Sequence, residues 1–202
     1  MNISINAHSS IRVDDMHFDP FMINEKSTPA KMVFLTHTHY DHLSKEDVLK
    51  VIDKNTIILA TQDAKEHLEP EFANQITYVS QNETLMVDDI KIETIPAYNK
   101  NKPFHPKSNN WVGYVITKDN FTFAVLGDTD AVSEHENLKL DLLFIPIGGT
   151  YTMNPEEAAK LTNKIKPKLV IPTHYGSIVG QKEDSAEFIK HLNKDINYKI
   201  II

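Results

Sequence analysis

The sequence predicts an α/β protein in which mixed strands form two sheets covered by helices. Short apolar runs separated by turn residues dominate the first two thirds of the chain. In the last third, apolar runs alternate with helical patterns, which is typical of strands joined by helices. No internal repeat interrupts this order. We therefore expect residues 1–202 to form a single domain.

The first part of the chain is expected to start with short strands. Their ranges are Ile3–Ile5, Ile11–Val13, Met16–Phe18 and Met32–Leu35. Ser44 then begins a helix as its N-cap, because Glu46 and Asp47 place negative charge in the first turn. The elements expected next are the strand Ile57–Leu59, a helix at Gln62–Leu68, and the strands Ile76–Val79, Glu83–Val87 and Ile90–Ile95.

The loop at 97–110 is polar and contains Pro103 and Pro106, so no regular element is expected there. Residues 118–120 form a hairpin turn between the strands Val112–Thr117 and Phe121–Leu126. The remaining elements are the strand Leu142–Ile145, a helix opened by Asn154-Pro155 with Glu157 closing a capping box, the strand Leu169–Ile171, a helix at Glu183–Leu192 and a last strand at Tyr198–Ile202.

Composition excludes several classes of protein. The chain has no cysteine, which rules out disulfides, thiolate zinc sites and cysteine nucleophiles and is compatible with the cytoplasm, where we expect the protein. The start lacks the pattern of a secretory signal, and no apolar run approaches the ~18 residues of a membrane span. A net charge of −7 argues against nucleic-acid binding, although Lys100, Lys102 and Lys107 could form a local basic patch.

The segment 36–42, with the sequence Thr-His-Thr-His-Tyr-Asp-His, follows the apolar run Met32–Leu35. Imidazole nitrogen and carboxylate oxygen are ligands that zinc and similar divalent ions prefer. His37 and His39 are two positions apart and leave an extended segment on the same side. Asp41 and His42 follow the turn and can face a second point. This layout indicates a two-metal site and a metallohydrolase.

Further donors are expected at other strand ends. Asp128 follows the apolar segment 121–126 and Gly127, and its two oxygens suit it to bridge two cations. His174 lies just beyond another apolar strand, within Pro172-Thr173-His174-Tyr175-Gly176. His105 is a third candidate, but it lies in a loop, so strand geometry does not fix its position.

The order of these motifs resembles the metallo-β-lactamase superfamily over nearly the whole chain. Residues 146–153 and 156–158, together with His8-Ser9-Ser10 and Asp19-Pro20-Phe21, resemble its small single-domain branch of ascorbate-6-phosphate lactonase-like and phospholipase D-like zinc-dependent hydrolases. The resemblance implies an αββα four-layer sandwich with the metals at one edge, between the two sheets.

Residue by residue, the resemblance implies that His37, His39 and a third histidine hold one metal. Asp41, His42 and His174 would hold the other, with Asp128 between them. Several relatives place the third histidine soon after a Pro-Ala pair, where this chain has Pro96-Ala97-Tyr98-Asn99. Here either His105 reaches back into the site or the first metal lacks this ligand; we favour His105.

Five other histidines are not expected to be ligands: His8, His17, His67, His135 and His191. His8 is a candidate for orienting a ligand, and Asp19 is a stronger one, because a carboxylate bonded to a ligating imidazole fixes its tautomer. His67 and His191 fall on helical stretches and are expected to be solvated.

The expected cofactor is Zn2+, as two ions, although Mn2+, Ni2+ or iron would fit the same donors. The expected reaction is attack by a metal-bound hydroxide on an ester, lactone or phosphodiester bond of a small molecule, with Asp41 as ligand and proton carrier. A phosphorylated substrate, paired with Lys102 and Lys107, is one option. The alternatives are a non-catalytic metal-binding regulator and a di-iron redox protein, which usually has glutamate at the position of His39. The sequence does not determine the oligomeric state, and a homo-oligomer is one option.

Overall fold

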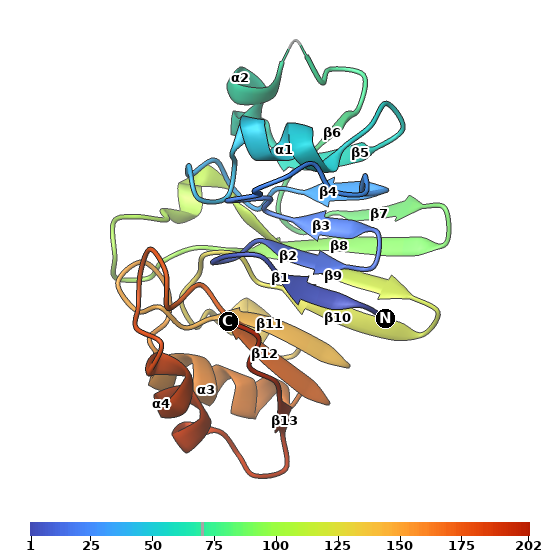
Figure 1. Cartoon of the computed structure of the whole chain (residues 1–202). Coiled ribbons are helices and arrows are strands. Elements are labelled where there is room, and N and C mark those ends of the chain that lie inside the picture. Colours follow the sequence, from blue (N-terminus) through green and yellow to red (C-terminus); the bar gives the residue numbers. More distant parts are fainter. Residues whose placement is uncertain (70) are drawn as a thin grey trace. The chain divides into compact units, whose positions relative to one another are not determined.

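The computed structural model describes residues 1–69 and 71–202, which form two compact units, 1–80 and 81–202 (Figure 1). Each unit contains one sheet, as the sequence predicts. The expectation that 1–202 act as a single domain stays a prediction. In the described ranges no helix is long and apolar enough to cross a membrane.

The sheet of the first unit, over its described residues, has six strands in the order β1-β2-β3-β4-β5-β6. Their bounds are Ile3–Ile5, Ile11–Val13, Met16–Phe18, Met32–Phe34, Ile57–Thr61 and Ile76–Val79. The strands β1 to β3 pair antiparallel, whereas β3, β4, β5 and β6 pair parallel to one another. The carboxyl ends of these parallel strands therefore meet at one edge of the sheet.

Helices α1 (Lys45–Val51) and α2 (Lys65–Leu68) lie on the same side of this sheet (Figure 1). A 3-10 turn at Gln62–Ala64 leads into α2. The predicted N-cap is confirmed, since the Ser44 side chain accepts a hydrogen bond from the Asp47 N–H. The core consists of apolar side chains of both helices and of the strands β4 and β5, and includes Val33, Val48, Val51, Ile58 and Leu68.

The sheet of the second unit, within residues 81–202, has seven strands in the order β13-β12-β11-β10-β9-β8-β7. From β7 to β13 their bounds are Thr84–Val87, Ile90–Pro96, Val112–Lys118, Phe121–Val125, Leu142–Pro146, Leu169–Thr173 and Asn197–Tyr198. Pairing is antiparallel from β7 to β10 and parallel from β10 to β13. The strand β8 therefore runs in the same direction as β10, β11 and β12, and all four end at one edge.

Helices α3 (Pro155–Ile165) and α4 (Asp184–His191) lie side by side and pack on this second sheet (Figure 1). The predicted capping box at the start of α3 is confirmed: Asn154 accepts from the Glu157 N–H, and the Glu157 carboxylate accepts from the Asn154 N–H. The core combines apolar side chains of strands and helices, among them Leu143, Ile145, Ala158, Leu161 and Phe188.

Two expectations about local structure are wrong. The loop at 97–110 contains a 3-10 turn at Lys107–Asn109, because both prolines precede it and leave its N–H groups intact. The last strand comprises only Asn197–Tyr198, since its ladder with β12 ends at the pair Val170–Tyr198. A further 3-10 turn at Ser133–His135 has no counterpart in the sequence prediction.

Candidate metal centre

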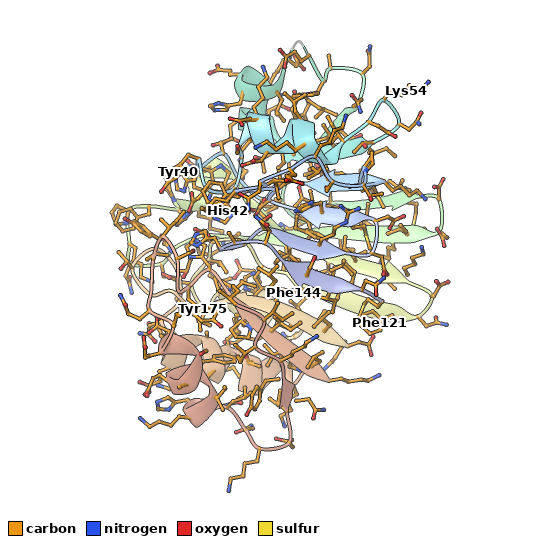
Figure 2. All side chains as sticks on the ribbon, viewed as in Figure 1. Tyr40, His42, Lys54, Phe121, Phe144 and Tyr175 are labelled. Atoms are coloured by element: carbon orange, nitrogen blue, oxygen red, sulfur yellow. The ribbon has the colours of Figure 1, made fainter. Side chains whose placement is uncertain are left out.

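In the first unit, the predicted donors follow the carboxyl ends of neighbouring parallel strands. Asp19 directly follows β3, and the segment from Thr36 to His42 follows β4. Figure 2 shows His42 and Tyr40 in the loop beyond β4. Loops at this edge carry the functional side chains of many parallel sheets, because the strands hold them rigidly while leaving them accessible.

A buried carboxylate, Asp19, orients two of the candidate ligands. Its Oδ2 atom lies 2.7 Å from His42 Nδ1 and 2.7 Å from Thr36 Oγ1, and Oδ1 accepts from the Thr36 N–H at 2.8 Å. Burial raises the pKa of Asp19, and the bonds from His42 and Thr36 oppose that rise. Since all these neighbours can donate, the consistent assignment is an ionised Asp19 with the His42 proton on Nδ1. The lone pair of His42 is then on Nε2, which lies 3.8 Å from Asp41 Oδ2.

The same network sets the ring of His37. Thr36 Oγ1 gives its proton to Asp19, so it acts as the acceptor toward His37 Nδ1, which is 2.9 Å away. The lone pair of His37 is then on Nε2, which lies 3.1 Å from His39 Nδ1. His37 and His39 therefore offer neighbouring ring nitrogens, as their spacing of two predicts.

His8, a candidate for orienting a ligand, contacts the predicted ligand Asp41. Its Nε2 atom lies 3.1 Å from Asp41 Oδ2, and that carboxylate oxygen lies 3.8 Å from His42 Nε2. His8, Asp41 and His42 offer ligand atoms within 4.8 Å of one another. The signal in the sequence was the motif His8-Ser9-Ser10, which places a left-handed residue, with a φ of 56° at His8, in a tight turn.

The second unit brings together the other three predicted donors. Asp128 follows β10, His174 follows β12, and His105 lies in the loop that follows β8. Asp128 Oδ2 is 3.2 Å from His105 Nε2 and 3.0 Å from His174 Nε2. All three side chains are buried. His105 therefore reaches a carboxylate at a strand end, although it starts from a loop.

The donor chemistry of both clusters fits a divalent transition metal. Imidazole nitrogens and carboxylate oxygens suit zinc, manganese, nickel and iron. In the first unit the rings of His37 and His42 have their second nitrogen committed to Thr36 or Asp19, an arrangement typical of ligating histidines. In the second unit two ring nitrogens meet one carboxylate oxygen, a set of atoms that a cation would satisfy together.

The other histidines lie apart from these roles. His67 is exposed on α2, as predicted. His135 is buried and its Nε2 donates to the Pro96 carbonyl at 2.7 Å, so it ties the turn at 133–135 to β8. His17 is buried with its Nε2 3.1 Å from Ser10 Oγ. Burial lowers the pKa of His17 and of His135 to about 4, so both rings are neutral at pH 7.

Known proteins are similar to this chain in sequence and in fold. Residues 1–175 match the family model described as Beta-lactamase superfamily domain. A UPF0173 metal-dependent hydrolase from Thermococcus onnurineus is 32% identical over 186 residues, which is 85% of this chain and 82% of the relative. A solved structure from Parabacteroides distasonis is 28% identical with a TM-score of 0.85, covering 98% of this chain and 91% of that chain.

The metallo-beta-lactamase fold protein YhfI from Bacillus subtilis has a TM-score of 0.71 at 14% identity, covers 98% of this chain and 91% of its own, and shows the fold alone. The predicted fold class is thereby confirmed. Fold and donor clusters together define a metal-dependent hydrolase of the metallo-β-lactamase fold. The chain belongs to the β-lactamase superfamily and, within it, to the UPF0173 metal-dependent hydrolases.

Proposed function

We propose that the donor clusters of the two units serve one centre of two zinc ions, and that this centre hydrolyses an ester, lactone or phosphodiester bond. The proposal is carried by one observation in the first unit: hydrogen bonds determine the tautomers of two histidine rings. Asp19 and Thr36 hold the protons of His42 and His37 on Nδ1, which presents both Nε2 atoms as ligands. Such an arrangement serves a metal better than a purely structural imidazole.

The ligands proposed for one ion are His37, His39 and His105, and those for the other are Asp41, His42 and His174, with Asp128 shared by both. This division is the one that the family resemblance implies. Support also comes from the number of donors. A zinc ion in a catalytic site usually takes three protein ligands and keeps one open position, so two ions need about six ligands. Neither cluster alone supplies that many.

Bound zinc would supply Lewis acidity toward the scissile carbonyl or phosphoryl oxygen and a more acidic water at neutral pH. Asp41 is the residue proposed to accept a proton from the attacking water and pass it to the leaving group. Its Oδ2 atom is 3.1 Å from His8 Nε2, so His8 limits rotation of the carboxylate. A fixed orientation keeps the carboxylate aligned for both proton transfers, from the water and to the leaving group.

The two lysines considered for binding a substrate phosphate are already paired with carboxylates. Lys102 Nζ lies 2.5 Å from Asp130 Oδ1 and donates to the Thr152 carbonyl. Lys107 Nζ lies 2.8 Å from Glu134 Oε1 and 4.4 Å from the centre of the Tyr98 ring. A substrate phosphate would have to compete with these carboxylates, so the lysines support such a substrate less than their spacing in the sequence suggests.

The test is to measure hydrolysis by zinc-loaded protein of a panel that contains p-nitrophenyl phosphodiesters, p-nitrophenyl esters and simple lactones. We expect hydrolysis of at least one class, and loss of both bound zinc and activity in a His37→Ala, His39→Ala double variant. His67→Ala is the matched control, because that histidine is exposed on α2. Full zinc content and activity in the double variant would overturn the proposal. Full zinc content without turnover on any class would favour a metal-binding regulator.

A further inference from the structure

Asn99 lies in the loop after β8 and contacts His105 with one end of its side chain. Its Oδ1 atom accepts from the His105 N–H at 3.1 Å and lies 3.0 Å from His105 Nδ1. Its Nδ2 atom donates to Asp130 Oδ1 at 3.1 Å and to the Tyr151 carbonyl at 2.9 Å. Asn99, His105 and Asp130 are all buried.

These contacts fix which end of the amide faces which neighbour. The carbonyl of Tyr151 can only accept, and so can the carboxylate of Asp130 when ionised, so the NH2 group of Asn99 must face them. The backbone N–H of His105 can only donate, so the amide oxygen must face His105. The contacts at both ends of the Asn99 amide therefore require the same orientation of its oxygen and nitrogen atoms.

The amide orientation determines the tautomer of His105. An amide oxygen accepts and cannot donate, so a bond between Oδ1 and Nδ1 requires the ring proton on Nδ1. In the neutral ring the lone pair is then on Nε2. That atom lies 3.2 Å from Asp128 Oδ2, on the side of the predicted ligands.

Asn99 is itself held by a partly buried ion pair. Lys102 Nζ lies 2.5 Å from Asp130 Oδ1, and the Lys100 N–H donates to Asp130 Oδ2 at 2.9 Å. Lys102 also donates to the Thr152 carbonyl. The bonds of Asn99 are therefore part of a network that ties the loop at 97–110 to the loops around 130 and 151, and such a network restricts rotation of its members.

We propose that Asn99 is a positioning residue that fixes His105 in the Nδ1–H tautomer and thereby presents its Nε2 atom to a metal. The proposal rests on the proposed function, in which His105 is a ligand. It explains how a histidine on a loop, without the support of a strand, is oriented by a side-chain partner. His37 and His42 are oriented by Thr36 and Asp19, which lie just beyond the ends of β4 and β3.

The first measurement is long-range 1H–15N NMR of the histidine rings in the full-length, metal-free protein, with the His105 signals assigned from their loss in His105→Gln. We expect a pyrrole-type Nδ1, which carries a proton, in the wild type. A pyridine-type Nδ1 in the wild type would overturn the proposal. This result does not depend on zinc, so it separates failure of the proposal from failure of the proposed function.

The second measurement compares variants by the same spectrum and by zinc affinity in competition with a chelator. Asn99→Leu keeps the size of the side chain and removes the acceptor, so we expect loss of the Nδ1–H tautomer and about 10–100-fold weaker zinc binding. Asn99→Asp keeps an acceptor, so the tautomer should persist and the affinity fall less. Asn101→Leu, at an exposed asparagine of the same loop, is the matched control and should resemble the wild type.

If Asn99 only ties the loops together through its NH2 group, the results expected of the variants are different. Asn99→Leu and Asn99→Asp would then behave alike, because both lose the donor to Asp130 and Tyr151. That result, or a wild-type tautomer and zinc affinity in Asn99→Leu, would overturn the proposal.

Discussion

His42 Nδ1 lies 2.7 Å from Oδ2 of Asp19, a residue 23 positions earlier in the chain. The contact forms because β3 and β4 are parallel neighbours, so the residues that follow them share one edge of the sheet. Asp19 has a φ of 43°, a left-handed conformation that aspartate and asparagine tolerate better than most side chains.

Asp19→Asn should therefore preserve the backbone and remove the charge that holds the His42 proton on Nδ1. We expect zinc affinity to fall about 10–100-fold with the fold retained, because ligands lose this much when their orienting partner is changed. Zinc titration in the presence of a competing chelator measures the effect. Asp14→Asn, at an exposed residue that also has a positive φ, is the control. Unchanged zinc affinity in Asp19→Asn would show that the contact does not orient His42.

Gly148 makes room for the backbone of His174. A Cβ atom at this position would lie 2.2 Å from the His174 carbonyl oxygen, a distance at which the backbone must move. We expect Gly148→Ala to lower the free energy of unfolding by roughly 1–3 kcal/mol, as overpacking does, and to weaken zinc binding through the shift of His174. Urea unfolding and zinc titration measure both effects.

Gly149→Ala is a useful comparison for Gly148→Ala. A Cβ at Gly149 would have Asn154 Cβ as its nearest neighbour, 3.9 Å away, but the φ of Gly149 is +86°, so only the backbone conformation opposes the substitution. We expect a loss of about 1–2 kcal/mol from the left-handed backbone and little change in zinc affinity. Equal zinc affinity in the two variants would contradict a role of Gly148 in placing His174.

His135 should make stability depend on pH. Burial lowers its pKa in the folded state from 6.5 to about 4. As pH falls below 6.5 the unfolded chain binds a proton that the folded protein does not bind until about pH 4, so stability present above pH 6.5 is lost across this window. The loss attributable to His135 is about 3 kcal/mol, by the conversion of one pKa unit to about 1.4 kcal/mol.

Urea unfolding of the metal-free protein at a series of pH values measures this loss. His135→Gln keeps a donor for the Pro96 carbonyl and cannot titrate, so its stability should fall less steeply from pH 6.5 to 4; His17, which has a similarly lowered pKa, still contributes to the remaining slope. His67→Gln, at an exposed site, should follow the wild type. A His135→Gln curve parallel to the wild type would contradict the account.

Much of the fold was predictable because local patterns determined it. Apolar runs closed by turn residues located β4, β10 and β12, and the caps at Ser44 and Asn154 located the starts of α1 and α3. The donors that directly follow strands were predictable for the same reason, since a strand end fixes where the next side chains emerge. The short extent of β13 could not be predicted from the sequence, because pairing with β12 depends on tertiary contacts rather than on β-propensity.

The residues that orient the ligands were harder to predict. Asp19 was identified as a candidate because it ends a strand, but its partner His42 depends on which strands are neighbours. Asn99 had no signal of its own, since the path of the loop at 97–110 follows from contacts with Asp130 and Tyr151 rather than from periodicity. Side chains that act through other side chains are visible only when the sheet order and the loop paths are known.

The central claim is that the histidines and aspartates of both units hold the same pair of metal ions. The most direct test is a crystal structure of the zinc-loaded protein, with anomalous diffraction recorded on both sides of the zinc absorption edge. We expect two zinc sites, one bound by His37, His39 and His105 and the other by Asp41, His42 and His174, with Asp128 contacting both. Zinc bound by donors of one unit alone, or anomalous density away from these residues, would contradict the claim.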